Sequence, residues 1–322
     1  MEYKKKLIFL FSLIAVLAVT YTASLVFDPQ FSGTRSAAYV WLDSRFAGRI
    51  AGIEITSQDE TTELVKRNNQ WFVLHNEREY PARQLRVEDF IGIFTTRAAW
   101  PVRSSSAASH ERLGVGAEPV SRVRFYGETS TLLDVLLGSD DITGREIYLR
   151  RHAQNEVRSG DNLFSVYVRG GANGWYNLRL IPESEDGRLG IDNVQRLTVL
   201  NLNEAQTFNK RNRQWVFTGG EPPYETRSAE ETDQSTIDNY VRTILNMEGD
   251  DFTDFDEVDL NMITHSNIVI EFGNGSVRSV WFSGPDETGR RLARVDGVDY
   301  IYSIAPWAVQ RIFRNDRDFE RQ

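Results

Sequence analysis

Two short segments of the sequence could supply the paired carboxylates of an acid–base site. They are Asp141–Gly144, which reads Asp-Ile-Thr-Gly, and Asp286–Gly289, which reads Asp-Glu-Thr-Gly. Two carboxylates that share one proton form the catalytic pair of aspartic proteases. The protease motif is Asp-Thr-Gly, however, and in both segments one residue separates the Asp from the Thr. Because Asp and Gly are also ordinary turn residues between strands, the pattern favours two β-turns over a catalytic pair.

The histidines and serines that could form a metal or nucleophilic site are scattered along the chain. No two histidines stand four residues apart, and no acidic residue accompanies them at the spacing of a zinc site. The four are His75, His110, His152 and His265. The run Ser104–Ser106 lies near His110, but no nucleophile-elbow or oxyanion pattern surrounds it. The sequence therefore predicts no zinc site, and it favours a solvated loop for the serines.

An acidic cluster and a glycine run offer two further possibilities. Calcium prefers six or more oxygen ligands, which carboxylates between residues 250 and 259 could provide. These are Asp250, Asp251, Asp254, Asp256, Glu257 and Asp259. The cluster lacks the central Gly of an EF-hand loop and is interleaved with Phe252, Phe255 and Val258, which favours a strand or loop with one buried face. The run Gly170–Gly174 has no Lys-Ser/Thr, so a phosphate-binding loop is not expected. We predict no catalytic, cofactor-binding or metal-binding residues and no cofactor.

The elements that would position any site occur in two copies. The segment Gln70–Val73 returns as Gln214–Phe217, each time after a basic, amide-rich turn, and this predicts a β-hairpin with a buried Trp in each copy. Behind each hairpin, apolar residues at i, i+3, i+4 and i+7 predict a packed helix. These are Val87, Phe90, Ile91 and Phe94 in the first copy and Ile237, Tyr240, Val241 and Ile244 in the second. The second copy is about six residues longer between hairpin and helix, in Gly219–Asp233, where two prolines suit a loop.

Residues farther along the two copies also correspond to each other. Gly127 corresponds to Gly273, and the Thr-Gly-Arg that begins at Thr143 corresponds to the one that begins at Thr288. Val166-Tyr167 is matched to Ile301-Tyr302 on the premise that the first copy has a longer polar loop, residues 152–162. Strands are expected at 53–57, 61–67, 70–75, 120–126, 131–137, 146–151 and 163–168, and again at 197–202, 206–210, 214–218, 267–272, 277–283, 292–295 and 300–304. Helices are expected at 83–99, 232–247 and 307–314, the last with Pro306 in its first turn. The fold class is α+β, with two tandem repeats that each combine a mainly antiparallel sheet with one packed helix.

Composition and the N-terminus limit the class of protein. The chain has 322 residues, a net charge of −9 and no cysteine, which suggests about two domains and argues against disulfides, thiolate metal sites and nucleic-acid binding. Lys4–Lys6 precede the uncharged segment Leu7–Phe27, which as a helix would span the hydrocarbon core of a membrane. A cleaved signal peptide is the competing interpretation, but bulky Tyr21 disfavours a cut after Ala23. The lysines predict a cytoplasmic N-terminus and an extracytoplasmic remainder.

These observations divide the chain into six parts. They are a cytoplasmic tip and transmembrane anchor at 1–28, a spacer at 29–50, the first repeat at 51–182, a polar linker at 183–190, the second repeat at 191–314, and a charged tail at 315–322 that is expected to fray. The segment from Glu221 to Asp259 contains 13 acidic residues and only two arginines. It predicts either a docking face for a basic partner or a surface that keeps a β-rich protein soluble.

The N-terminal span and the two Gln-Trp hairpins, together with Tyr80-Pro81-Ala82 before the first helix and the Leu113-Gly114-Val115 loop, carry a family resemblance. The chain resembles the bacterial domain-of-unknown-function family number four-three-four-zero. The second copy departs from the pattern, with Val258–Asn261 in place of the Leu-Gly-Val loop. The resemblance implies an accessory protein of a gliding-motility-type ABC transport system, and it brings no catalytic residues with it.

The function expected from the sequence is therefore non-enzymatic. We expect a single-pass protein of the bacterial inner membrane whose bulk is periplasmic and which serves as an accessory or scaffold subunit, with ABC transporter subunits as partners. The alternative is a module that binds a glycan or peptide in the cleft between the repeats, since ligands favour domain interfaces.

Overall fold

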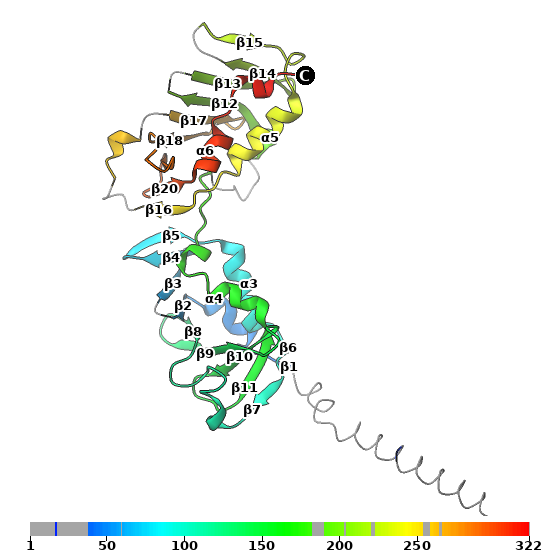
Figure 1. Cartoon of the computed structure of the whole chain (residues 1–322), viewed down its shortest axis with the longest axis vertical. Coiled ribbons are helices and arrows are strands. Elements are labelled where there is room, and N and C mark those ends of the chain that lie inside the picture. Colours follow the sequence, from blue (N-terminus) through cyan, green and yellow to red (C-terminus); the bar gives the residue numbers. More distant parts are fainter. Residues whose placement is uncertain are drawn as a thin grey trace, which may run out of the picture. The chain divides into compact units, whose positions relative to one another are not determined.

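The structure is a computed structural model, and it describes residues 17, 38–58, 60–181, 190–202, 204–219, 223–253, 258–263 and 266–321. The chain divides into two compact units, Met1–Tyr176 and Asn177–Gln322 (Figure 1). The predicted anchor, Leu7–Phe27, lies outside the described residues apart from Leu17. Within the described ranges, no helix combines the length and the apolar character needed to cross a membrane.

The first unit is built on a nine-stranded antiparallel sheet with the order β5-β4-β3-β2-β8-β9-β10-β11-β7. The strands are β2 (Gly52–Ser57), β3 (Glu60–Arg67), β4 (Gln70–His75), β5 (Arg78–Pro81), β7 (Val102–Ser104), β8 (Ser121–Tyr126), β9 (Thr131–Asp140), β10 (Glu146–Arg151) and β11 (Val157–Asp161). Apart from this sheet, β1 (Ala38–Tyr39) pairs with β6 (Ala98–Ala99). The helices are α3 (Gln84–Thr95) and α4 (Ser165–Val168).

Helix α3 covers one face of this sheet. In β8, Val123 and Phe125 are fully buried while the residues between them are half-exposed, as the two-residue period of a strand requires. Phe125 contacts Phe90 and Phe94 of α3 with ring centroids 5.9 and 5.0 Å apart. The helix face predicted from the sequence is confirmed at these positions and at Val87, all of which are buried.

The second unit repeats the architecture. Its antiparallel sheet also has nine strands, in the order β15-β14-β13-β12-β17-β18-β19-β20-β16. The strands are β12 (Val194–Asn201), β13 (Glu204–Arg211), β14 (Gln214–Gly219), β15 (Glu225–Arg227), β16 (Asp251–Thr253), β17 (Ser266–Phe272), β18 (Val277–Phe282), β19 (Arg291–Val295) and β20 (Ile301–Ile304). The helices are α5 (Gln234–Leu245) and α6 (Pro306–Ile312). Each strand has a counterpart at the same place in the first sheet, so the predicted duplication is confirmed.

The second strand of each predicted hairpin, β4 or β14, carries near its start a buried Trp that is held by a glutamine from the following helix. Trp71 and Trp215 are 3% and 1% exposed. The Gln84 side chain accepts a hydrogen bond from the Trp71 backbone N–H (2.8 Å) and donates one to its carbonyl (2.9 Å). Gln234 makes the same pair of bonds with Trp215, at 2.7 and 3.0 Å. We call this contact the glutamine clamp. The glutamine side chain thus satisfies the backbone N–H and carbonyl of the Trp, as a neighbouring strand would.

The predicted strand at residues 163–168 is wrong, and the polar loop predicted at 152–162 holds only for 152–156, because residues 157–161 form a strand. The last strand of the first repeat is β11, and residues 165–168 form helix α4. Leu149 pairs with Arg158 as Ala293 pairs with Tyr302, so the counterpart of Tyr302 is Arg158 at an offset of 144 positions (302 − 158). Apolar alternation fails in β11 because three of its four buried residues, Arg158, Ser159 and Gly160, are polar or small. The Arg158 side chain donates to the Trp100 carbonyl at 2.7 Å.

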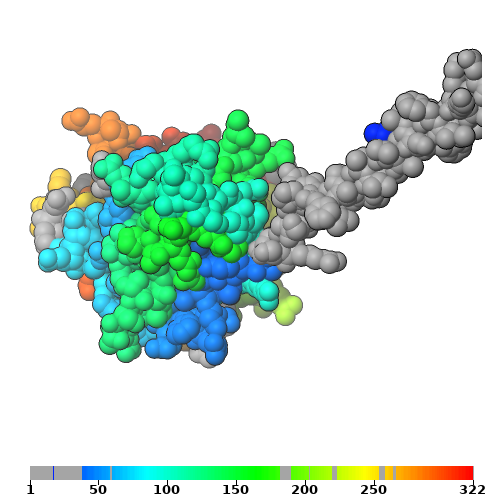
Figure 2. All heavy atoms as spheres, turned by 90° about the horizontal axis from the view of Figure 1, so that it is seen from below, coloured from blue at the N-terminus to red at the C-terminus, as the bar shows by residue number. Residues whose placement is uncertain are grey.

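The spacer predicted at residues 29–50 is corrected for its described part. Residues 38–50 belong to the first unit, where Trp41 is 1% exposed and its ring lies 5.5 Å from that of Trp100. Leu42 N–H also donates to the Phe94 carbonyl at 2.9 Å. In the space-filling view, the blue segment that begins at residue 38 lies against green segments of the same unit (Figure 2). The packing of Trp41 against Trp100 and the hydrogen bond to the end of α3 therefore hold residues 38–50 in the first unit.

The boundary between the repeats also shifts. Residues 177–181, assigned from the sequence to the first repeat (51–182), pack in the second unit, where Leu180 and Ile181 join its core. Leu180 N–H donates to the Met247 carbonyl at 3.0 Å. The predicted linker lies outside the described residues except for Gly190.

The charged tail predicted at 315–322 does not fray over its described residues. Phe319 is fully buried, with its ring 4.9 Å from Phe208 and 5.0 Å from Tyr240. The Phe319 carbonyl accepts a hydrogen bond from the Asp233 N–H at 3.0 Å. One aromatic residue thus anchors a charged segment to the core of the second unit, which extends this repeat beyond its predicted end at 314.

Candidate functional site

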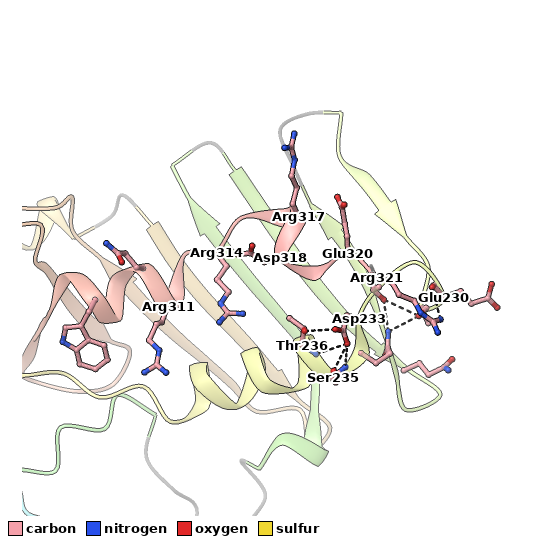
Figure 3. Close-up of a pocket in the computed structure, with 16 residues that line it drawn as sticks. Glu230, Asp233, Ser235, Thr236, Arg311, Arg314, Arg317, Asp318, Glu320 and Arg321 are labelled. Carbon is pink, nitrogen blue, oxygen red and sulfur yellow. Dashed lines mark hydrogen bonds between the residues drawn. The ribbon is translucent and has the colours of Figure 1, made fainter.

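A groove of about 1110 Å³ lies in the second unit between helix α6 and the start of helix α5 (Figure 3). One wall carries Trp307 and Arg311 of α6 and Arg314 just beyond it, and the other carries the first turn of α5. The C-terminal residues Arg317 and Arg321 also line it. We call this surface, lined by these four arginines and Trp307, the arginine groove.

The sequence of α6 explains why Trp307 and Arg311 share a face. Pro306 opens the helix, and Ala308 and Ile312 bury its inner side. Residues four positions apart are neighbours on a helix surface, so Trp307 and Arg311 lie together on the outer side. Trp307 is 60% exposed, and the Arg311 guanidinium lies 5.9 Å from the centre of its ring. This wall therefore presents an aromatic face beside a cation.

The arginines of the groove have few acidic partners. Within the part of the chain that the structure describes, no carboxylate forms an ion pair with Arg311, Arg314, Arg317 or Arg321. The acidic residues that line the groove are Glu230, Asp233, Asp318 and Glu320. Glu320 pairs with Arg227 at 3.0 Å, so its charge is already compensated.

Asp233 is also committed, because it caps helix α5. Its carboxylate accepts hydrogen bonds from the backbone N–H groups of Ser235 (2.9 Å) and Thr236 (3.2 Å) and from both hydroxyls. The Ser235 and Thr236 side chains, followed by the Thr236 N–H, lower the pKa of Asp233 to about 2. Only Glu230 and Asp318 remain to oppose four arginines. The groove thus has an excess of positive charge in a chain whose net charge is −9.

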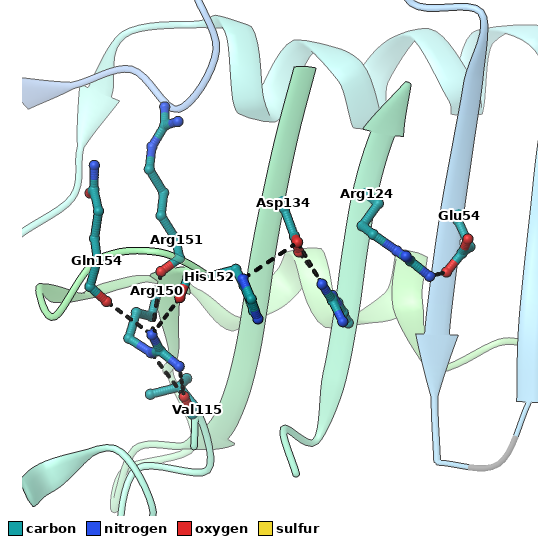
Figure 4. Close-up of polar contacts among 9 residues, drawn as sticks. Glu54, Val115, Arg124, Asp134, Arg150, Arg151, His152 and Gln154 are labelled. Atoms are coloured by element: carbon teal, nitrogen blue, oxygen red, sulfur yellow. Dashed lines mark hydrogen bonds and ion pairs between the residues drawn. The ribbon is translucent and has the colours of Figure 1, made fainter. Parts of the chain in front are cut away.

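A second polar surface lies on the sheet of the first unit, on the face opposite α3 (Figure 4). Arg122 donates to Asp134 with Nε at 2.9 Å and Nη2 at 2.6 Å, and Arg124 forms an ion pair with Glu54. These four side chains come from β2, β8 and β9, and we call them the charged ladder. Their exposed fractions lie between 19% and 32%, so the ion pairs are half-buried. His152 Nδ1 lies 3.9 Å from Asp134.

The Leu113–Val115 loop covers another part of this face. Leu113 and Val115 pack in a small buried cluster with Leu136 and Val157. Arg150 donates to the Val115 carbonyl with Nε at 2.9 Å and Nη2 at 2.7 Å. Burial lowers the pKa of Arg150, whose guanidinium is held by backbone carbonyls. A pocket of about 730 Å³ lies along the loop, lined by Arg122, Arg124 and Arg150 among others.

Two glycines explain why this loop can approach the sheet. Gly114 has φ +70°, a conformation that L side chains rarely adopt. A Cβ at Gly138 of β9 would lie 2.0 Å from the Leu113 carbonyl oxygen. The Leu-Gly-Val motif therefore has a structural role in docking the loop on the first sheet.

Comparison of the two units distinguishes the features that the shared fold requires from those that only one unit has. Glu54, Arg124 and Asp134 lie side by side across β2, β8 and β9. At the matching places of the second sheet, Thr198 lies beside Val269 and Val269 beside Ser279. No charge stands there. The glutamine clamp belongs to both units and the charged ladder to one, so the fold forms without the ladder.

The two Asp-x-Thr-Gly segments form turns, as predicted. Asp141 Oδ1 accepts from the N–H groups of Arg145 and Glu146, both at 2.9 Å. Asp286 Oδ1 accepts from the N–H groups of Thr288 (2.8 Å) and Arg290 (2.9 Å). Hydrogen bonds, that from the Glu146 N–H first, lower the pKa of Asp141 to about 2. Each carboxylate is occupied by its own turn.

Among the described residues, no histidine side chain is hydrogen-bonded to a serine of 104–106. His110 is buried with Nε2 2.9 Å from the Asn155 carbonyl oxygen, and the Ser104 hydroxyl accepts from Ser109 at 2.7 Å. His75 is exposed at the end of β4, and His265 lies outside the described residues. In the described ranges, no three His, Asp or Glu side chains are grouped so that they could hold a metal ion.

The acidic cluster is only partly described. Asp250 pairs with Arg290 at 2.7 Å, and the carboxylates of Asp251 and Asp259 accept from the N–H groups of Phe252 and Asn261. Residues 254–257, which hold Asp254, Asp256 and Glu257, lie outside the described ranges.

Other acidic residues of the 221–259 segment and the glycine run serve the fold. Asp238 accepts from the Trp215 indole N–H at 2.7 Å, and Glu231 accepts from the Ser228 N–H at 2.8 Å. In the Gly170–Gly174 run, the Ala172 N–H donates to the Glu60 carboxylate at 3.2 Å. The Glu60 carboxylate thus accepts from one backbone N–H of this run.

Sequence reasoning missed the arginine groove. The spacing of Trp307, Arg311, Arg314 and Arg317 by three or four residues would have indicated one polar face with an aromatic residue. The opposite wall comes from residues some 70 positions earlier (307 − 235), and no local pattern connects the two.

The fold and these surfaces define a duplicated antiparallel α+β protein whose two units share a frame and differ in the charged surfaces that they present. The chain belongs to the family described as Domain of unknown function (DUF4340), whose pattern matches residues 71–267. This confirms the family resemblance seen in the sequence. Searches of curated proteins and of solved structures find no match.

Proposed function

We propose that this chain is a non-enzymatic accessory protein of a membrane transport assembly. In this proposal an N-terminal helix tethers it to the bacterial inner membrane, its bulk is periplasmic, and the first unit contacts a subunit of an ABC transporter of the gliding-motility type. The observation that supports a binding role is the charged ladder. It stands on one sheet face only, and the matching residues of the second unit are uncharged.

The ladder suits recognition of a protein partner. Its two ion pairs run across three neighbouring strands, so positive and negative groups alternate on a sheet face. Charges arranged in this way set register and suppress wrong partners more than they add affinity. A partner with the complementary alternation would satisfy both signs at once. The alternative of a glycan or peptide in the cleft between the repeats stays a prediction.

A charge swap within one ion pair tests the proposal. The double variant Glu54→Arg/Arg124→Glu keeps an ion pair between β2 and β8 but inverts the polarity that a partner meets. We expect this variant to lose the transporter subunits that co-purify with the parent after gentle detergent extraction. The matched control is Arg196→Glu/Glu271→Arg, which swaps the 3.1 Å pair on the corresponding strands, β12 and β17.

The control should retain the transporter subunits, identified by mass spectrometry. If the Glu54/Arg124 swap also retains them at parental levels, the ladder is not the contact surface. Equal loss in both variants would indicate a general effect of altered charge and would likewise contradict the proposal.

The proposed tether makes its own prediction. The protein should stay in the membrane fraction after a carbonate wash, with an intact mass that includes Leu7–Phe27. A mature protein that begins after residue 20 would contradict it.

A further inference from the structure

We propose that the arginine groove of the second unit binds an extended, acidic peptide segment of a partner protein. Arg311 and Arg314 point from the α6 side toward helix α5, whose first turn carries Ser235 and Thr236 (Figure 3). The volume of about 1110 Å³ exceeds that of most small-molecule pockets, which have up to about 1000 Å³. It suits several residues of a chain better than a single ion. This site lies in the unit that lacks the charged ladder.

The strongest observation is the unpaired state of Arg314. This side chain is half-buried, and within the described ranges its charged group meets no carboxylate, only the ring of Tyr240 at 5.8 Å. A partly desolvated cation gains most from an anion that restores its lost solvation. A carboxylate can accept two parallel hydrogen bonds from one guanidinium. Arg311, which is exposed and three residues earlier, could hold a second carboxylate.

In the first unit, the corresponding region beside the start of α3 is occupied by contacts within the chain itself. The glutamine clamp aligns Gln84 with Gln234, so Arg83 corresponds to Asp233 and Arg86 to Thr236. Arg83 Nε donates to the Tyr176 carbonyl at 2.9 Å.

Arg86 also contacts other residues of the first unit in this region. It donates to the Val166 carbonyl at 2.8 Å and lies 4.7 Å from the ring of Tyr167 and 5.2 Å from that of Trp175. In the first unit the two arginines beside the helix start thus bond to carbonyls of the chain itself, although the buried Arg86 Nε has no hydrogen-bond partner among the described residues. The arginines of the arginine groove form no ion pair within the described ranges, which leaves their charges available to a partner.

The remaining charges favour a peptide over a dense polyanion. Glu230 and Asp318 also line the groove, and they would repel a ligand that is negative along its whole length. In an extended chain, alternate side chains point the same way and are separated by about 7 Å, so carboxylates can meet arginines while the residues between them avoid the acids. Exposed Trp307 offers an apolar or aromatic contact at α6.

A binding titration with the full chain in detergent micelles tests the inference. The probe is a short fluorescein-labelled peptide of alternating Glu and Ser, and its neutral counterpart has Gln for each Glu. We expect the acidic probe to bind with a salt-dependent affinity and the neutral one not to bind. The variant Arg311→Gln/Arg314→Gln should weaken binding at least about tenfold, because it removes two charge-assisted contacts.

The matched control, Arg278→Gln/Arg294→Gln, removes the same charge from β18 and β19, whose residues do not line the groove. It should leave the affinity within about twofold, since distant surface charges are largely screened. Melting temperatures verify folding. If the double variant is unstable, Arg311→Gln alone still tests the site, because Arg311 is exposed, and it should weaken binding measurably.

Three results would overturn the inference. They are unchanged peptide binding in the groove variants, equal weakening in the control, and equal binding of the neutral peptide. Groove-dependent binding of phosphatidylcholine vesicles that contain phosphatidylserine, without peptide binding, would assign the groove to a membrane surface instead and would also refute a peptide site. None of these results bears on the Glu54/Arg124 swap, so the two proposals fail separately.

Discussion

Removal of the glutamine clamp should destabilise the second unit more than the first. In Gln234→Ala, the Trp215 N–H loses its acceptor at 2.7 Å and the Trp215 carbonyl loses its donor at 3.0 Å. In Gln84→Ala, the Trp71 carbonyl keeps a second donor, the Ala82 N–H at 3.0 Å. At the Trp backbone, Gln234→Ala therefore leaves two groups without these partners and Gln84→Ala leaves one. Each glutamine also donates to one further carbonyl, Gln84 to Ala82 at 2.8 Å and Gln234 to Ala229 at 3.3 Å, so this additional loss is common to both variants.

The magnitude follows from unsatisfied buried groups, each of which costs about 1–3 kcal/mol. Because the clamps are part-buried and water can reach some of the vacated space, we take the lower half of that range. We expect a loss of about 2–4 kcal/mol for Gln234→Ala and about 1–2 kcal/mol for Gln84→Ala. The control Gln195→Ala, on the exposed side of β12, should change stability by less than about 0.5 kcal/mol.

Urea unfolding followed by tryptophan fluorescence measures these differences. A second variant, Gln234→Glu, adds a test by pH. The ionised carboxylate can accept from the Trp215 N–H but cannot donate to its carbonyl, whereas the protonated form can do both. The site therefore raises the pKa of the introduced carboxyl, and stability relative to the parent is higher below the unfolded pKa of about 4.3 and is lost as pH rises. This account of the clamp would be refuted by a Gln234→Ala variant as stable as the parent. It would also be refuted by a Gln234→Glu variant whose stability relative to the parent does not change with pH.

Three other perturbations have defined outcomes. Trp71→Ala and Trp215→Ala should each cost about 3–5 kcal/mol in chemical denaturation, and parental stability in either would show that the two positions are not equivalent core sites. Asp233 has its pKa lowered from 3.8 to about 2, so its cap stabilises the fold above pH 3.8 and this contribution is lost as pH falls toward 2. Asp233→Ala should remove that acid-dependent part from the stability profile, and an unchanged profile would contradict it. Gly138→Ala should cost about 1–3 kcal/mol because its Cβ would meet the Leu113 carbonyl, whereas Gly92→Ala, inside α3 with open space, should add up to about 1 kcal/mol. Equal thermal shifts in the two glycine variants would contradict the docking geometry of the loop.

The parts of the fold predicted from the sequence are those with local, periodic signals. The hairpins at Trp71 and Trp215 and the buried faces of α3 and α5 follow from turn residues and apolar spacing alone. Strand β11 gives no such signal, since its buried Arg158 depends on the Trp100 carbonyl and the Tyr39 ring, which are distant in sequence.

The same limit applies to the chain ends and the sites. Phe319 is a single aromatic residue in a charged segment, and only the finished core of the second unit gives it a place. The Gln84 and Gln234 clamps bridge a strand and a helix, and neither periodicity nor composition identifies them. The charged ladder requires the register of three strands, and the pairing of Arg124 with Glu54 depends on that register.

Each sheet consists of two meanders that meet along one seam, and this arrangement has a kinetic consequence. In the first unit the seam joins β2 to β8, where the Ser121 hydroxyl donates to Ser57 across 64 positions of the chain, and β12 and β17 form the same seam in the second. Most other neighbouring strands are successive in the chain and joined by short turns. Local pairings form fast, while pairings that close long loops form late. We therefore expect hairpins to form first and the β2–β8 seam to limit the folding rate. Truncation of Ile55 or Val123 in the seam should slow folding, whereas truncation in the outer hairpins should mainly speed unfolding.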